Sequence, residues 1–160
     1  MLTIVVAYSA NRVIGLDGEL PWRLPGDMRH FRELTIGGTV LMGRRTFESL
    51  PERFRPLPQR RNLVLSHDPA YAPDGAESFT DLPAALAACD HDCFVIGGEV
   101  TYRETLASCE LVHATEIDTE LDGDAFFPEL EPGQWICAHS SERMVENGLS
   151  FAFRTYERRA

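Results

Sequence analysis

Long apolar runs, paired cysteines and a net positive charge are all missing from this sequence. No stretch reaches 18 apolar residues, so a membrane-spanning helix is not expected. The four cysteines form no C-x-x-C pair and have no histidine cluster near them, which argues against a zinc site and predicts reduced thiols. The net charge of -10 argues against a general nucleic-acid or membrane-surface binder, because such partners select basic surfaces.

The chain has the size and composition of one globular domain. Its 160 residues, 44% of them hydrophobic and 25% charged, suffice for a sheet-centred core, and no repeat or linker interrupts them. We therefore predict a single domain over residues 1–160. The first eight residues lack the basic segment and cleavage site of a signal peptide, so a cytoplasmic protein is expected.

Strand-like and helical patterns alternate through the first two thirds of the chain, and strands dominate the end. Strands are predicted at Leu2–Tyr8, Thr39–Gly43, 63–65, Glu77–Phe79, 93–96, Leu111–Ile117, Trp135–Ser140 and 149–157. Helices are predicted from Pro25, over 47–50, from a cap at Thr80 or Asp81 through Ala88, and over 100–107. The pattern predicts an α/β fold: a three-layer domain with a mainly parallel central sheet, an antiparallel C-terminal edge strand and flanking helices.

Residues 20–34 predict a rigid loop that runs into a helix. If Pro25 begins that helix, then Asp27, Phe31 and Leu34 share one face. An acid in the first helical turn often only faces water, where the helix dipole favours it. An acid beside apolar residues is instead a candidate for a partly dehydrated carboxylate with a ligand or a function.

Two strand-to-helix junctions carry glycines that would let the backbone approach a phosphate. Residues 43–46 read G-R-R-T and add two arginines, while residues 97–100 read G-G-E-V. Neither junction matches G-x-G-x-x-G or a P-loop. Close packing alone explains most glycine pairs of this kind, so the junctions by themselves only weakly indicate a phosphate site.

Five motifs taken together resemble the dihydrofolate reductase family. Residues 11–27, N-R-V-I-G-L-D-G-E-L-P-W-R-L-P-G-D, are similar to its mobile active-site loop and its pteridine-binding acid. The others are V-L-M-G-R-R-T-F-E-S-L at 40–50, P-L-P-Q-R-R-N at 56–62, V-I-G-G at 95–98 and D-G-D-A-F-F-P at 122–128. They follow the family order and cover essentially the whole chain.

The resemblance implies an NADPH site. It implies that Gly97 and Gly98 are joined by a cis peptide bond and that Arg44, with Ser66 and His67, holds the adenosine 2'-phosphate. Arginine is well matched to a phosphate, so NADPH is favoured over NADH. The residues expected at the cofactor are Ala7, Ile14, Leu20, Gly43, Arg44, Arg45, Thr46, Ser66, His67, Ile96, Gly97, Gly98, Glu99, Val100 and Tyr102.

On the substrate side, the resemblance implies that Asp27 binds the pterin amino group and ring N3, with Thr115 bridging to its carboxylate. Arg60 matches the arginine that binds the α-carboxylate of the glutamate tail. The residues expected at the substrate are Val5, Ala7, Asp27, Met28, Phe31, Leu50, Leu57, Arg60, Ile96 and Thr115. Without the resemblance, the apolar members would be ordinary core residues and Arg60 a solvated loop charge.

The implied reaction transfers a hydride to C6 of 7,8-dihydrofolate and a proton to N5. Asp27 would contact the pterin away from N5, so the proton is expected to arrive through a water that Trp22 helps to order. Asp124 is expected to gate the mobile loop. No metal, nucleic acid or membrane partner is expected, and a monomer is predicted.

Two other functions stay open at this point. A pteridine or pyrimidine reductase of the same fold would keep the cofactor site and change the substrate pocket. A nucleotide-binding module without catalysis would not need Asp27 and Trp22 beside a glycine-rich loop. The chain departs from the family pattern at Leu20, at Glu99-Val100 and in a longer connector at 52–54.

Overall fold

A run of β-branched residues at the amino terminus forms the middle of the structure, a computed structural model that describes all 160 residues. Strand β1 (Leu2–Tyr8) has parallel partners on both sides, β6 (Cys93–Gly97) and β7 (Leu111–Ile117). Ile4 is fully buried, and Val5 and Val6 are nearly so. A central strand with both faces covered requires apolar residues at consecutive positions.

The remaining strands extend the sheet in both directions from β1. They are β3 (Thr39–Gly43), β4 (Arg61–Leu65), β5 (Glu77–Phe79), β9 (Trp135–Ser140), β10 (Met144–Glu146) and β11 (Leu149–Arg158). The order is β10-β11-β7-β1-β6-β3-β4-β5, with β9 also paired to β11. Every pair of neighbouring strands in the series β7-β1-β6-β3-β4-β5 is parallel, whereas β11 is antiparallel to β7, β9 and β10.

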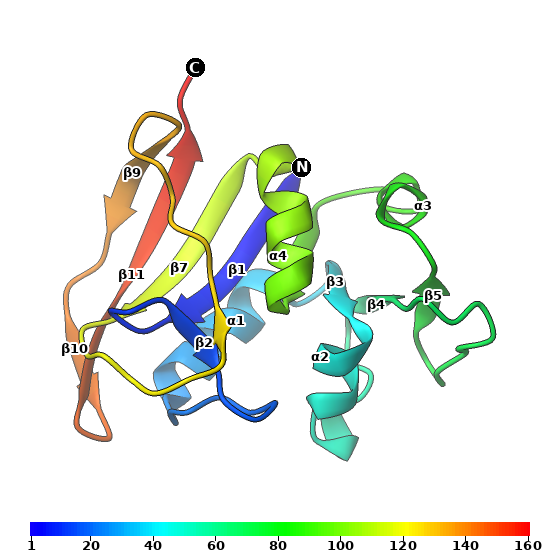
Figure 1. Cartoon of the computed structure of the whole chain (residues 1–160), viewed down its shortest axis with the longest axis horizontal. Helices are drawn as coiled ribbons and strands as arrows, with labels where there is room; N and C mark the ends of the chain where they lie inside the picture. The colour runs from blue at the N-terminus through cyan, green and yellow to red at the C-terminus, as the bar shows by residue number, and fades with distance from the viewer.

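Four α-helices and two short 3-10 helices connect these strands. They are α1 (Pro25–Thr35), α2 (Arg44–Ser49), α3 (Leu82–Ala87) and α4 (Glu99–Thr105), with Glu52–Phe54 and Leu106–Ser108 as the 3-10 helices. Phe31 of α1 and Phe47 of α2 pack on one face of the sheet, while Ala85 of α3 and Tyr102 of α4 pack in the core cluster of the other face. Figure 1 shows α4 in front of the sheet and α1 behind it. The predicted three-layer α/β fold is therefore confirmed.

Local signals account for several element boundaries. Pro25 occupies the first turn of α1, and the Asp81 side chain accepts a hydrogen bond from the Ala84 amide at 2.8 Å to cap α3. Asn147 and Gly148 both have positive φ, 49° and 77°, which is the backbone of a tight hairpin turn. The sequence predicts this turn between the strand Trp135–Ser140 and the final strand, and the structure adds a short strand, β10, immediately before it, so that the turn joins β10 to β11.

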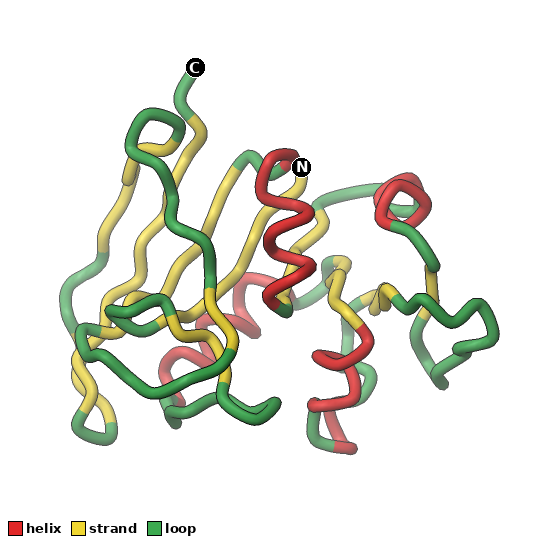
Figure 2. The backbone as a smooth tube through the Cα atoms, viewed as in Figure 1, coloured by secondary structure: helices red, strands yellow, loops and turns green.

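Some elements were not predicted. Strands β2 (Val13–Gly15) and β8 (Ala125–Phe126) form a separate two-stranded sheet, which Figure 2 shows within long loops. Helix α2 begins at Arg44, three residues before its predicted start, because the first turn holds polar residues that carry no apolar periodicity. No helix has the length and apolar character needed to cross a membrane.

Candidate active site

Asp27 is the centre of the candidate site. The Thr115 hydroxyl on β7 donates a hydrogen bond to Oδ1 of Asp27 at 2.6 Å, so a carboxylate on α1 is joined to the sheet. Burial is the largest cause that raises the pKa of Asp27, and the charge of Glu146 raises it further, while the hydrogen bond from Thr115 lowers it. The structure therefore supports the interpretation of Asp27 as a partly dehydrated carboxylate, and not as a first-turn acid that faces water.

Most of the apolar side chains expected at the substrate belong to two hydrophobic clusters of the sheet. Leu57 is buried, and Phe31, Leu50 and Ile96 pack against its cluster with part of their surface exposed. Val5 is 8% exposed, and Ala7 packs against the cluster that contains Trp22. Met28 differs from the rest, because 58% of its surface is exposed on the outer edge of α1.

Arg60 and Arg61 are adjacent in sequence but have different partners. Arg61 pairs with Glu77 through two hydrogen bonds, of 2.6 and 2.8 Å. Arg60 instead donates to the Thr35 hydroxyl at 3.0 Å and to the Pro58 carbonyl at 2.9 Å, and no carboxylate pairs with it. Partial burial lowers the pKa of Arg60. A half-buried guanidinium without a counter-ion is well suited to bind an anion.

The two glycine junctions lie side by side, because Met42 of β3 pairs with Gly97 of β6. The peptide bond between Gly97 and Gly98 is cis, as the resemblance implies. A Cβ placed on Gly97 or Gly98 would lie 3.4 or 3.3 Å from the Thr46 hydroxyl, and one on Gly43 would lie 3.2 Å from the Thr101 hydroxyl. A Cβ at Gly43 or Gly98 would therefore be in tight contact, and the φ of 131° at Gly97 favours glycine; we call the backbone at these three positions, with the hydroxyls beside it, the glycine cradle.

Arg44 is held at the end of β3 by charge and by an aromatic ring. Its guanidinium carbon lies 4.0 Å from the centroid of the Tyr71 ring, and its nitrogens lie 3.4 Å from Glu48 and 4.0 Å from Asp68. Ser66 is buried at the end of the neighbouring strand β4, whereas His67 and Arg45 are exposed. Arg44, Ser66 and His67, the side chains expected at the 2'-phosphate, thus follow the ends of two adjacent strands, β3 and β4.

Other predicted cofactor residues vary in exposure. Tyr102 is in the core, 4% exposed, and donates to the Val5 carbonyl at 2.8 Å, so it lies beneath the Gly97 backbone. Ile14 is partly buried against the main core cluster. Leu20 and Val100 are 59% and 67% exposed, which leaves both available to a ligand.

Trp22 is buried in a cluster with Leu24, Ile117 and Phe151, and Ala7, the strand partner of Thr115, packs against this cluster. Its indole N–H has no acceptor among the protein atoms. Because buried donors are normally satisfied, this N–H fits a water or a ligand atom.

The loop between β2 and α1 is tied to the loop that contains β8. Oδ2 of Asp124 accepts from the Asp17 amide at 3.1 Å, and the Asp124 amide donates to the Gly15 carbonyl at 3.0 Å. Gly123 lies so close that a Cβ there would come within 2.2 Å of Val13. The predicted partner of the mobile loop, Asp124, is therefore in contact with it.

Sequence reasoning missed the contacts that the β10–β11 hairpin makes with this site. Both carboxylate oxygens of Glu146 accept from the Gly26 amide, at 2.9 and 3.2 Å, and the Asn147 side chain donates to the Arg23 carbonyl at 2.6 Å. The turn signal at Asn147 was visible in the sequence. Its contact with a segment about 120 residues earlier was not.

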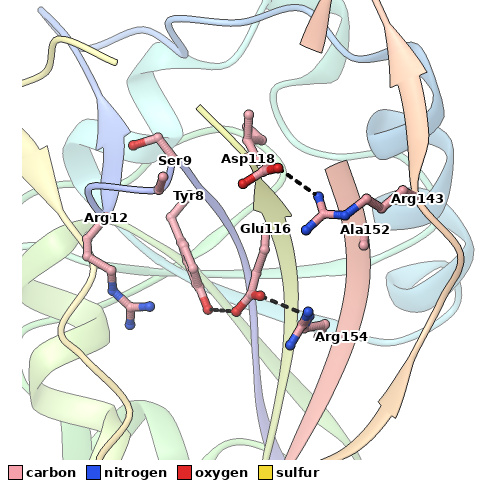
Figure 3. A pocket seen from close by; sticks show the side chains of 10 residues that line it. Tyr8, Ser9, Arg12, Glu116, Asp118, Arg143, Ala152 and Arg154 are labelled. Carbon is pink, nitrogen blue, oxygen red and sulfur yellow. Dashed lines mark hydrogen bonds and ion pairs between the residues drawn. The ribbon is translucent and has the colours of Figure 1, made fainter. Parts of the chain in front are cut away.

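A second cluster of ionisable side chains lies on the opposite face of the sheet, around a cavity of about 250 Å³ (Figure 3). Tyr8 and Tyr156 donate to Oε2 of Glu116 at 2.6 and 2.5 Å, and Arg154 lies 3.0 Å from its Oε1. Burial raises the pKa of Tyr156 to about 12. Glu116 thus has two hydroxyl donors and one guanidinium as partners, which indicates a structural network around this carboxylate.

The fold and the site around Asp27 define the class of protein: an α/β domain that binds small ligands across the carboxyl ends of its parallel strands. The family model "Dihydrofolate reductase" matches residues 1–158. The chain belongs to the dihydrofolate reductase family.

Relatives and solved structures agree with this assignment. A dihydrofolate reductase of Neisseria meningitidis is 39% identical, with 98% of each chain covered. One of Mycobacterium tuberculosis is 40% identical and covers 99% of this chain and 98% of its own. The structure of Enterococcus faecalis dihydrofolate reductase complexed with NADP(H) and RAB-propyl has a TM-score of 0.91 at 32% identity, with 100% and 97% covered.

Proposed function

We propose that this chain reduces 7,8-dihydrofolate to 5,6,7,8-tetrahydrofolate with NADPH, and that Asp27 is its central catalytic residue. The observation that carries the proposal is the carboxylate of Asp27, hydrogen bonded to Thr115 and with its pKa raised by burial, in a chain of this family. The reaction makes the chain an oxidoreductase of one-carbon metabolism.

Asp27 binds the pterin through hydrogen bonds. Thr115 occupies one carboxylate oxygen, Oδ1, so Oδ2 remains free to accept from the 2-amino group and N3 of the pterin. Val5, Ala7, Leu50 and the other apolar residues expected at the substrate form the walls around the rings. Exclusion of water by these walls strengthens the hydrogen bonds of Asp27.

Arg60 selects a substrate that carries a carboxylate. Its guanidinium lies 5.8 Å from the Phe31 ring centroid, so an aromatic linker that packs on Phe31 would present a carboxylate to Arg60. A p-aminobenzoylglutamate tail has both groups. This contact favours a folate over a simple pterin.

NADPH supplies the hydride from its nicotinamide C4 when it is bound. The glycine cradle fits a cofactor, because the backbone at Gly43, Gly97 and Gly98 carries no side chain that would keep a diphosphate away, and Thr46 adds a hydroxyl. Arg44, Ser66 and His67 hold its adenosine 2'-phosphate, and the other residues expected at the cofactor contact the rest of the molecule.

The proton for N5 comes through water. The indole N–H of Trp22 orders that water, since it has no acceptor within the protein. Asp27 polarises the pterin from the far side, where a raised pKa keeps its protonation sensitive to pH. Asp124 gates the reaction by holding the mobile loop closed over the site.

The chain acts as one domain over residues 1–160, as a cytoplasmic monomer that binds no nucleic acid. The net charge of -10 disfavours nucleic acid. The four cysteines are free thiols, which are typical of a reducing compartment.

The test is the loss of reduced-nicotinamide absorbance when the purified protein is mixed with NADPH and 7,8-dihydrofolate. NADH and a simple pterin, each replacing one reactant, are the controls. We expect oxidation that requires both NADPH and dihydrofolate. If bound NADPH is oxidised only in the presence of another pterin or a pyrimidine, the chain is a related reductase with a different substrate. If NADPH binds but no substrate leads to its oxidation, the chain is a nucleotide-binding module.

A further inference from the structure

Glu99 is the first residue of α4 and follows the cis Gly97-Gly98 pair directly. Its two carboxylate oxygens have different partners. Oε1 accepts from the Phe126 amide at 2.8 Å, and Oε2 lies 3.2 Å from Nε of Arg103, one helical turn along. The side chain is 32% exposed. The contact with Phe126 therefore joins two segments that lie 27 residues apart in the sequence.

Phe126 belongs to β8, and the residue that follows it, Phe127, is buried in the main core cluster, so Glu99 is a second anchor at this end of the strand. Its partner strand β2 has three residues, and Val13 of β2 pairs with Phe126. Asp124, two residues before Phe126, binds the Asp17 amide of the mobile loop. Two-stranded sheets of this length are marginal by themselves, so anchors outside the pair determine whether it persists.

The anchor that Glu99 provides is a charge-assisted hydrogen bond. Such bonds are stronger than those between neutral groups, and this one lies at a residue that is partly shielded from solvent. Arg103 offsets part of the carboxylate's charge, but it is on the solvent side, with 53% of its side chain exposed. The negative charge of Glu99 therefore remains next to the glycine cradle.

We propose that Glu99 is a positioning residue that fastens the β2–β8 pair, and with it the mobile loop, to the helix beside the cofactor. The inference rests on the proposed function, because it takes the cradle as the diphosphate site. Glu99 has two opposed effects. Its hydrogen bond favours the closed loop, and its charge repels the diphosphate, so closure is obtained at a cost in cofactor affinity.

Two substitutions separate these effects. Glu99→Gln retains an acceptor for the Phe126 amide and removes the charge, whereas Glu99→Ala removes both. Glu104, an exposed residue of the same helix, provides the matched controls Glu104→Gln and Glu104→Ala. The measurements are amide hydrogen exchange at Phe126 and Asp17 in the cofactor-free protein, NADPH dissociation constants at low and high salt, and single-turnover hydride transfer.

We expect Glu99→Ala to speed exchange at Phe126 by about tenfold and at Asp17 several-fold, since the lost bond has a charged acceptor. Hydride transfer should slow about fivefold in Glu99→Ala and recover in Glu99→Gln. Both variants should bind NADPH several-fold more tightly at low salt, with a smaller gain at high salt because the repulsion is screened.

Unchanged exchange at Phe126 in Glu99→Ala, or an equal effect of Glu104→Ala, would overturn the tether. A Glu99→Gln protein that binds NADPH no better than the wild type would overturn the charge effect. If the wild-type protein itself failed to bind NADPH, the proposed function would fall, while the exchange data would still report on the tether.

Discussion

Thr115→Val changes one hydrogen bond at the centre of the site and little else. Thr115 is 3% exposed, and its hydroxyl donates to Oδ1 of Asp27 at 2.6 Å. Valine has nearly the same shape, so the surrounding sheet should keep its packing. The hydrogen bond lowers the pKa of Asp27, and we therefore expect its removal to raise that pKa further above the ordinary value.

The size of the effect follows from how a hydrogen bond depends on charge. A bond to a charged acceptor contributes about 1.5–3 kcal/mol, and one between neutral groups about 1 kcal/mol. The difference, roughly 0.5–2 kcal/mol, is the extra stabilisation that Thr115 gives to the carboxylate form. It corresponds to a change of about 2- to 30-fold in the ratio of protonated to ionised Asp27.

Glu146→Gln should shift the same equilibrium in the opposite direction. The Glu146 carboxylate accepts from the Gly26 amide at 2.9 Å, and its charge raises the pKa of Asp27. Glutamine keeps an acceptor of the same size and removes the charge. We expect the pKa of Asp27 to fall, by an amount that decreases at high salt.

The assay is a carbon-13 NMR titration of the Asp27 carboxyl in the wild type and both variants, together with the pH dependence of kcat/KM. Opposite shifts in the two variants are the expected result. A downward shift in Thr115→Val, or shifts of the same sign in both variants, would refute the reasoning.

Further predictions concern three charged side chains of the site. Asp27→Asn should lose most turnover at neutral pH and regain part at low pH, where the substrate arrives protonated; unchanged turnover would exclude the proposed role. The same variant should unfold at a higher temperature than the wild type at neutral pH. Burial raises the pKa of Asp27 in the folded protein, so ionisation of this group destabilises the fold as the pH rises through its raised pKa. Below the ordinary pKa of 3.8, thermal melts of the variant and the wild type should therefore no longer differ. Arg44→Ala should weaken NADPH binding by about 10- to 150-fold and NADH binding much less in titrations, since a phosphate pairing of about 1.5–3 kcal/mol is lost, and equal losses would contradict the assignment. Arg60→Gln should raise KM for dihydrofolate at least tenfold and leave a simple pterin unaffected, whereas Arg61→Gln, which breaks the pair with Glu77, should change the melting temperature but not that selectivity.

Much of this molecule was predictable from local pattern. The β-branched run of β1 requires a strand covered on both faces, and Pro25 and Asp81 specify where two helices begin. Helical periodicity put Asp27 on the face of Phe31. These features depend only on residues close in sequence, so the amino-acid order determines them directly.

The family motifs extended the prediction to contacts that no periodicity reveals. The resemblance paired Thr115 with Asp27, 88 positions apart, and the structure contains that hydrogen bond. It also implied the cis bond between Gly97 and Gly98. It did not reveal the partners of residues at which this chain departs from the family pattern, such as Glu99.

Only the tertiary structure decided those partners. The family motif distinguishes Arg60 from Arg61, but only the structure gives their partners within the protein, Thr35 for Arg60 and Glu77 for Arg61. Glu146 meets Gly26 because β10 pairs with β11 in one particular register. Register and chain crossings set which distant groups meet, and these arise from the packing of the whole sheet, which no short stretch of sequence encodes.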